Sequence, residues 1–140
     1  MELEVSTVID RPVATVWDWY AVHHVENHPR WDPAIELENP TGRPLAVGTV
    51  IKRRSSRFET PTDGTMEIVG FEPEKVMRAK IQDGPMTING WALFAATGEN
   101  ETKLTIGGEF PGMDESMREM MRAGIEGSAA TIKSLIESET

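Results

Sequence analysis

Three histidines lie near the end of one predicted helix, where they could carry acid–base or metal chemistry. His24 and His28 are four residues apart, with His23 and Asp32 close by. That spacing lets two imidazoles share a helix face and bind a metal ion, and an unperturbed imidazole titrates at about pH 6.5. Pro29 opposes the metal interpretation, because proline disfavours helix at the residue before it. We predict no metal site and keep His24 as a candidate acid–base residue, with a plain polar surface as the simpler alternative.

A short basic segment is the second candidate for chemistry. Its members are Lys52, Arg53, Arg54 and Arg57. Alternate side chains of a strand point to opposite faces, so Arg53 shares one face with Arg57 and not with Arg54. An inward arginine could hold a ligand carboxylate or a polarised carbonyl by a charge-assisted hydrogen bond. The alternative is a solvated strand face that pairs with acidic side chains such as Glu67.

The elements that would position these residues follow from hydrophobic periodicity. Residues 2–9 alternate as a strand, residues 13–27 have helical spacing, and a short turn or second helix follows at 30–33. Further strands are predicted at 35–38, 49–58, 65–71, 76–82, 86–97 and 102–110. Turn signals such as PTDG at 61–64 and GENE at 98–101 separate them. About seven strands at hairpin spacing predict an antiparallel sheet.

One long amphipathic helix is predicted at 114–137, with Asp114 as its N-cap. The first half of its apolar stripe is rich in methionine, and the second half carries stiffer side chains such as Ile132 and Ile136. Methionine is flexible and suits surfaces that repack around different apolar ligands, although it also serves as core filler. Met117, Met120 and Met121 are therefore candidates for a ligand-binding wall, with ordinary core packing as the alternative.

Four tryptophans supply most of the aromatic surface. Trp17 shares a helix face with apolar neighbours and is predicted to lie in the core, whereas Trp19 lies off that face. Trp91 lies on a strand with two apolar faces, so its direction is open and it stays a candidate ligand contact.

Composition excludes several classes of protein. The 140 residues are enough for one domain, residues 1–140, with a real core. With no cysteine, the chain has no disulfide, thiol nucleophile or thiolate metal site. A formal net charge of −9 disfavours nucleic acid and anionic membranes as partners, and no apolar run is long enough to insert in a membrane. We find no cofactor motif and no secretory signal, and therefore expect no cofactor and a cytoplasmic location.

Three local motifs resemble the START-like superfamily, also called the helix-grip fold. They are VIDRP at 8–12 followed by Val16-Trp17, HPRWDP at 28–33, and the closing helix from GIEG at 124–127 to LIE at 135–137. The chain resembles in particular the bacterial branch described as polyketide cyclase/dehydrase and lipid transport (SRPBCC). The resemblance implies an α+β fold in which a curved antiparallel sheet wraps around the long C-terminal helix. It also implies an apolar cavity between helix and sheet, whose floor Trp31 would form because it matches the family tryptophan.

Three functions fit this resemblance. The first is binding of a small, largely apolar molecule in the cavity, with Arg53 orienting it and Trp31, Trp91 and the methionines as contacts. The second is a polyketide cyclase/dehydrase-like enzyme in which a polar pair moves a proton. Its candidate residues are His24, Tyr20, Arg53 and Glu67. The third is a protein-interaction module whose cavity has collapsed.

Overall fold

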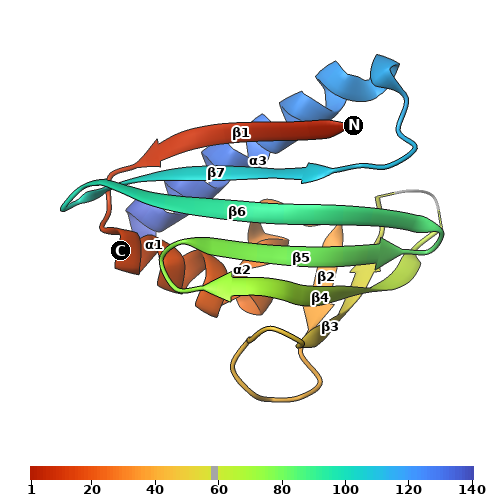
Figure 1. Cartoon of the computed structure of the whole chain (residues 1–140), viewed down its shortest axis with the longest axis horizontal. Coiled ribbons are helices and arrows are strands. Elements are labelled where there is room, and N and C mark those ends of the chain that lie inside the picture. The colour runs from red at the N-terminus through yellow and green to blue at the C-terminus, as the bar shows by residue number, and fades with distance from the viewer. Residues whose placement is uncertain (58–59) are drawn as a thin grey trace.

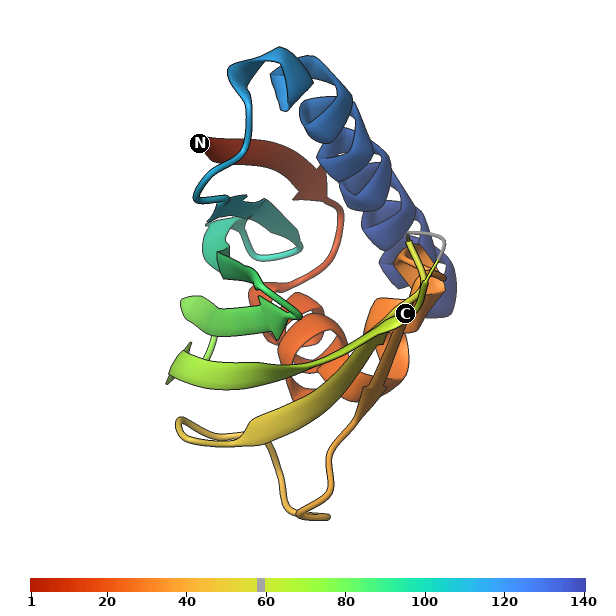
Figure 2. The same cartoon turned by 90° about the vertical axis from the view of Figure 1, so that its right-hand side faces the viewer.

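Seven antiparallel strands form one curved sheet in the order β1-β7-β6-β5-β4-β3-β2 (Figure 1). The computed structural model describes residues 1–57 and 60–140. The strands are β1 (Glu2–Ile9), β2 (Ile35–Glu38), β3 (Val50–Ser55), β4 (Thr62–Glu72), β5 (Val76–Asp83), β6 (Met86–Gly98) and β7 (Glu101–Glu109). Figure 2 shows α1 and α2 inside the curve of the sheet and α3 beside β1. The predicted helix-grip architecture is confirmed.

The helices are α1 (Val13–Trp17), the π-helical turn η1 (Asp18–Val22), α2 (His24–Trp31), the 3-10 turn η2 (Glu115–Met117) and α3 (Arg118–Glu139). The single helix predicted at 13–27 is therefore wrong in two respects. It breaks at His23, whose N–H bonds back to the Asp18 carbonyl, and α2 then continues through Pro29. Proline removes one helical hydrogen bond and crowds the preceding turn. Stacking of Trp31 on Tyr20 and His28 holds that last turn in place.

The turn predicted at 61–64 is also wrong, because β4 already begins at Thr62. Gly64 lies in this strand, and a Cβ there would come within 1.8 Å of the Gln82 carbonyl oxygen. The glycine signals a close approach between strands, not a turn. The strand predicted at 49–58 is observed as Val50–Ser55, and Phe58 lies outside the described residues.

The core lies between the inner face of the sheet and the first helices. Trp17 is 6% exposed and its ring meets Phe71 and Phe94 at centroid distances of 4.9 and 5.0 Å, which confirms its predicted core position. Trp19 is also buried, against Trp31, and its indole N–H donates to Glu139. Trp17 thereby fixes α1 against the sheet, and Trp19 links η1 to α2 and α3.

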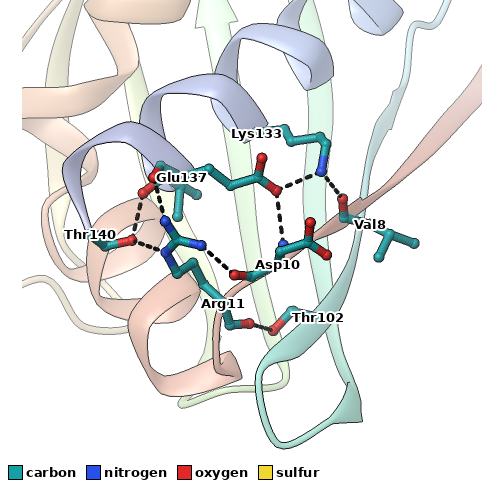
Figure 3. Close-up of polar contacts among 8 residues, drawn as sticks. Val8, Asp10, Arg11, Thr102, Lys133, Glu137 and Thr140 are labelled. Carbon is teal, nitrogen blue, oxygen red and sulfur yellow. Dashed lines mark hydrogen bonds and ion pairs between the residues drawn. The ribbon is translucent and has the colours of Figure 1, made fainter.

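The C-terminal half of α3 is fastened to the β1–α1 connection (Figure 3). Arg11 donates to the Glu137 carbonyl and to the Thr140 hydroxyl, and Lys133 donates to the Val8 carbonyl and the Glu137 carboxylate. The Asp10 backbone N–H donates to that same carboxylate at 2.9 Å. Cations at a helix C-terminus also complement its dipole. This end of α3 therefore has a fixed position on the sheet.

All buried side chains of α3 lie in this same half: Ala129, Ile132 and Ile136. They pack with the core, mainly against β1. Within residues 1–57 and 60–140, none of the helices has the length and apolar content that crossing a membrane requires.

Candidate functional site

A buried ion pair crosses the inner face of the sheet. Register places Arg53 on β3 opposite Gly64 on β4, and Gly64 opposite Asp83 on β5. Because Gly64 has no side chain, Arg53 reaches across it, and its Nε lies 2.9 Å from Asp83 Oδ1. The side chains of Arg53 and Asp83 are 7% and 12% exposed. The basic segment predicted from sequence thus turns one arginine inward.

The guanidinium of Arg53 is incompletely satisfied. Its Nε donates to both carboxylate oxygens of Asp83, but Nη1 is buried and has no hydrogen-bond partner among the described residues. Leaving a buried donor unpaired costs about 1–3 kcal/mol, and more for a charged group. An oxygen atom brought by a ligand would remove that cost. Arg53 is therefore the clearest candidate binding residue.

A chain of hydrogen bonds joins two imidazoles on the sheet-facing side of α2. His24 Nδ1 lies 2.9 Å from the Tyr20 carbonyl oxygen, and His24 Nε2 lies 3.0 Å from His28 Nδ1. Burial, the main cause, together with the positive charge of Arg53 lowers the pKa of His24 to about 4, although the bond to Tyr20 opposes the shift. Burial and the neighbouring positive groups also hold the pKa of His28 well below its usual value. Both rings are neutral at neutral pH.

Trp31 is the centre of an aromatic cluster next to these imidazoles. It stacks on Tyr20 at 5.1 Å and on His28 at 4.8 Å, and it meets His24 edge to face at 5.5 Å. Trp31 and His28 are half-buried, whereas Tyr20 and His24 are buried. Burial raises the pKa of the Tyr20 phenol. The cluster is thus an uncharged aromatic surface that remains partly open.

The methionine-rich half of α3 leaves the tightly packed core. Met117, the last residue of η2, and Met121 of α3 continue the stripe of Ile125 and Ala129 at four-residue intervals, yet both are only half-buried. Ile88, on the inner face of β6, is half-buried too. Arg118, the first residue of α3, donates a hydrogen bond to the Glu2 carbonyl. Strand register pairs Glu2 with Glu109, and Glu109 with Asn89, which is the neighbour of Ile88. Met117, Met121 and Ile88 are therefore incompletely covered at one end of the sheet.

This end of the sheet also carries the ion pair. Asp83 is the last residue of β5 and pairs with Met86 at the start of β6, two residues from Ile88. We call this region, comprising Met117, Met121, Ile88, Arg53 and Asp83, the open end of the sheet. It combines apolar side chains with one buried cation.

Three predicted contacts lie elsewhere. The indole N–H of Trp91 donates to Glu4, and Arg78 lies over its ring, on the outer face of the sheet. Glu67 is exposed on the outer face of β4, and Met120 is 66% exposed. The structure therefore does not bring these three to Arg53, because strand and helix periodicity point their side chains away from the inner face.

Open grooves on the surface of the described residues include two of similar volume. One, of about 410 Å³, runs between β1 and α3 and is lined by Val5, Thr7, Ala129 and Lys133 among others. The other, of about 400 Å³, crosses β2, β3 and β4 between Glu36, Lys52 and Asp63. Neither groove is lined by the methionines of α3. Both are open to solvent and charged along their rims.

Sequence reasoning missed Asp83 and Gly64. Gly64 belongs to the predicted turn at 61–64, and Asp83 lies one residue beyond the strand predicted at 76–82, although Met77, Ala79, Ile81 and Asp83 share one strand parity. An acid that ends an otherwise apolar strand face was a signal for a buried ion pair. His28 was noticed only for its spacing from His24, and nothing in that spacing indicated a hydrogen bond between the rings.

Comparison with known proteins agrees with this architecture. Residues 1–137 match the family model described as polyketide cyclase / dehydrase and lipid transport. No curated protein matches the chain in sequence.

Similar solved structures include the protein TTHA0849 from Thermus thermophilus (TM-score 0.75, 15% identity, covering 100% of this chain and 99% of that one). They also include Ara h 8.0201 (TM-score 0.73, 16% identity, covering 99% of this chain and 99% of that one). A third is norcoclaurine synthase from Thalictrum flavum in complex with dopamine and hydroxybenzaldehyde (TM-score 0.71, 13% identity, covering 100% of this chain and 88% of that one). At these identities the likeness concerns the fold alone.

Proposed function

The chain belongs to the polyketide cyclase/dehydrase and lipid transport family of the START-like superfamily, and on that basis we propose that it binds a small, largely apolar molecule at the open end of the sheet. The apolar body of the ligand lies between the methionine-rich half of α3 and the inner face. A carbonyl or carboxylate oxygen of the ligand accepts a hydrogen bond from Arg53 Nη1.

The unpartnered guanidinium nitrogen is the observation that carries this proposal. A buried cation requires compensation, and Asp83 bonds only to Nε in the structure. The half-buried Met117 and Met121 supply adaptable apolar surface at the same end of the sheet. A polar anchor next to adaptable apolar walls is the usual composition of a small-molecule site.

The enzyme alternative receives less support from the same residues. A general base works best when its pKa lies near the operating pH. His24 has a pKa of about 4 and is 2% exposed, so it is a weak and poorly accessible base at neutral pH. Glu67, another of the four candidates, lies on the opposite face. Holding a ligand without transforming it is therefore the better-supported role.

The apolar wall is tested with a matched pair of tryptophan substitutions. Met121→Trp fills the proposed space, whereas Met120→Trp adds the same bulk to the solvent side of the same helix turn. The probe is 6-propionyl-2-dimethylaminonaphthalene, an apolar fluorophore with one carbonyl. We expect Met121→Trp to weaken its binding about tenfold or more and Met120→Trp to leave it unchanged. Equal effects of the two variants, or no binding by the natural chain, would overturn the proposal.

The polar anchor is tested with Arg53→Lys. Lysine keeps a positive charge for Asp83 but lacks the second guanidinium nitrogen that the ligand oxygen requires. We expect this variant to bind the same fluorophore about tenfold more weakly, because it loses the free energy of one charge-assisted hydrogen bond. Arg54→Lys is the control, since Arg54 is exposed and faces Asp63. Circular dichroism of each variant checks that the fold is retained.

A further inference from the structure

The hydrogen-bond chain on α2 fixes the position of each imidazole proton. The Tyr20 carbonyl oxygen only accepts, so His24 Nδ1 must donate and carry the proton. In the neutral ring, His24 Nε2 is then an unprotonated acceptor. His28 Nδ1 lies 3.0 Å from it and must be the donor. The remaining nitrogen, His28 Nε2, consequently holds a free lone pair.

His28 Nε2 has no hydrogen-bond partner among the described residues. The His28 ring lies on the same face of α2 as the buried His24 and stacks on Trp31. Although it is on this inward face, His28 is only half-buried. Its acceptor nitrogen therefore belongs to the partly open aromatic surface and not to the solvated side of α2.

We infer that the ligand of the proposed site carries a hydroxyl or N–H donor, which His28 Nε2 accepts, in addition to the oxygen that Arg53 holds. The ligand class is thus a small aromatic or aliphatic molecule with both a carbonyl-type oxygen and a hydroxyl or amine-type donor. This inference rests on the proposed function. His28 and His24 act as specificity-determining residues, and neither forms a covalent bond.

Charge supports the acceptor role. Arg53 and Arg57 both act on His28, and their positive charges oppose addition of a second proton to its ring. The imidazole therefore keeps its lone pair at neutral pH, where a protonated ring would offer only donors. A ligand without a donor would leave that lone pair unsatisfied once water is displaced.

The tautomer is tested without any ligand. The chain has three histidines, so histidine labelled with 15N gives three separate ring systems in long-range 1H–15N spectra. At about pH 7 we expect Nε2 of both His24 and His28 to show the signal of an unprotonated nitrogen. A protonated Nε2 on His28 would overturn the inference, whatever the chain binds.

Ligand selection is tested with two matched probes, 1-naphthol and 1-methoxynaphthalene. Apolar burial alone favours the methoxy compound, because it has one more carbon. We expect the natural chain to bind 1-naphthol about tenfold more tightly than 1-methoxynaphthalene, because only 1-naphthol can donate the hydrogen bond. His28→Phe keeps an aromatic ring on Trp31 but removes the acceptor, and it should abolish the preference. His23→Phe, at an exposed position, should retain it.

The outcomes separate the two claims. Equal affinity of the natural chain for both naphthalenes would overturn the donor inference and leave the proposed function standing. Failure to bind either compound, or the fluorophore above, would overturn both. A preference for 1-naphthol that survives in His28→Phe would show that another group selects the donor, and would also overturn the inference.

Discussion

A neutral imidazole buried beside cations ties the stability of this protein to pH. His24 is enclosed by Tyr20, His28 and Trp31, and the charges of Arg53 and Arg57 act on the imidazole pair. In the unfolded chain its pKa returns to about 6.5, so the unfolded state binds a proton more readily. Stability from this group is fully present above about pH 6.5 and is lost as pH falls toward 4.

This linkage predicts an acid-side loss of stability well above the pH at which carboxylates titrate. From a native pKa of about 4, His24 alone should cost the fold about 2 kcal/mol between about pH 7.5 and about pH 5. His28 adds to the loss, since its pKa is also lowered. Urea unfolding at the two pH values measures the difference. His24→Gln should reduce it and His23→Gln should not, and an unchanged pH dependence in His24→Gln would contradict the assignment.

The long helix α3 has two halves that differ in their attachment to the rest of the fold. Its C-terminal half is fixed by the Arg11 and Lys133 contacts and by buried isoleucines. Its N-terminal half has no buried residue. Gly124 and Gly127 lie between them, and a Cβ at either would meet nothing within 4 Å. Packing therefore does not require these glycines, which lower the helical stability of the junction.

Replacing either glycine with alanine should stabilise the chain. Gly124→Ala and Gly127→Ala should each raise the free energy of unfolding by about 0.5–1 kcal/mol, because alanine loses less backbone entropy in a helix. Urea unfolding at neutral pH measures the gain. Gly64→Ala is the contrasting variant, since its Cβ would collide with the Gln82 carbonyl and should destabilise strongly. A loss of stability at 124 or 127 would show that this junction contacts a group that the alanine displaces.

Over the protein as a whole, net charge limits the surfaces with which it associates. A chain with a formal charge of −9 is repelled by an anionic lipid surface, and several of its cations are engaged by carboxylates, as in Arg30–Glu139 and Arg57–Asp32. We therefore expect no association with anionic lipid surfaces.

Vesicle flotation tests this expectation. At low salt, the protein should float with neither phosphatidylglycerol-containing nor pure phosphatidylcholine vesicles, and vesicles with a cationic lipid should retain it. Added salt should release it from the cationic vesicles, because screening shortens the range of charge interactions. Retention by the phosphatidylglycerol vesicles alone would contradict the charge argument and indicate a specific lipid contact.

The architecture could be predicted from the chain alone, since alternation, turn signals and the stripe of the last helix are carried by residues that are neighbours in sequence. The same local rules placed Trp17 in the core and identified the stripe of α3 that is buried in its C-terminal half. They failed at Pro29 and at Gly64, where stacking of Trp31 and a close approach of strands outweighed local preference.

The candidate site, in contrast, depends on how distant segments pack. Arg53 and Asp83 are 30 residues apart and meet because strand register aligns them across a glycine. Shifting such a register by one residue would turn both side chains to the opposite face, and no local pattern in the chain fixes it. The inward direction of Arg53, the outward direction of Trp91 and the proton positions on His24 and His28 all follow from contacts that only the folded chain brings together.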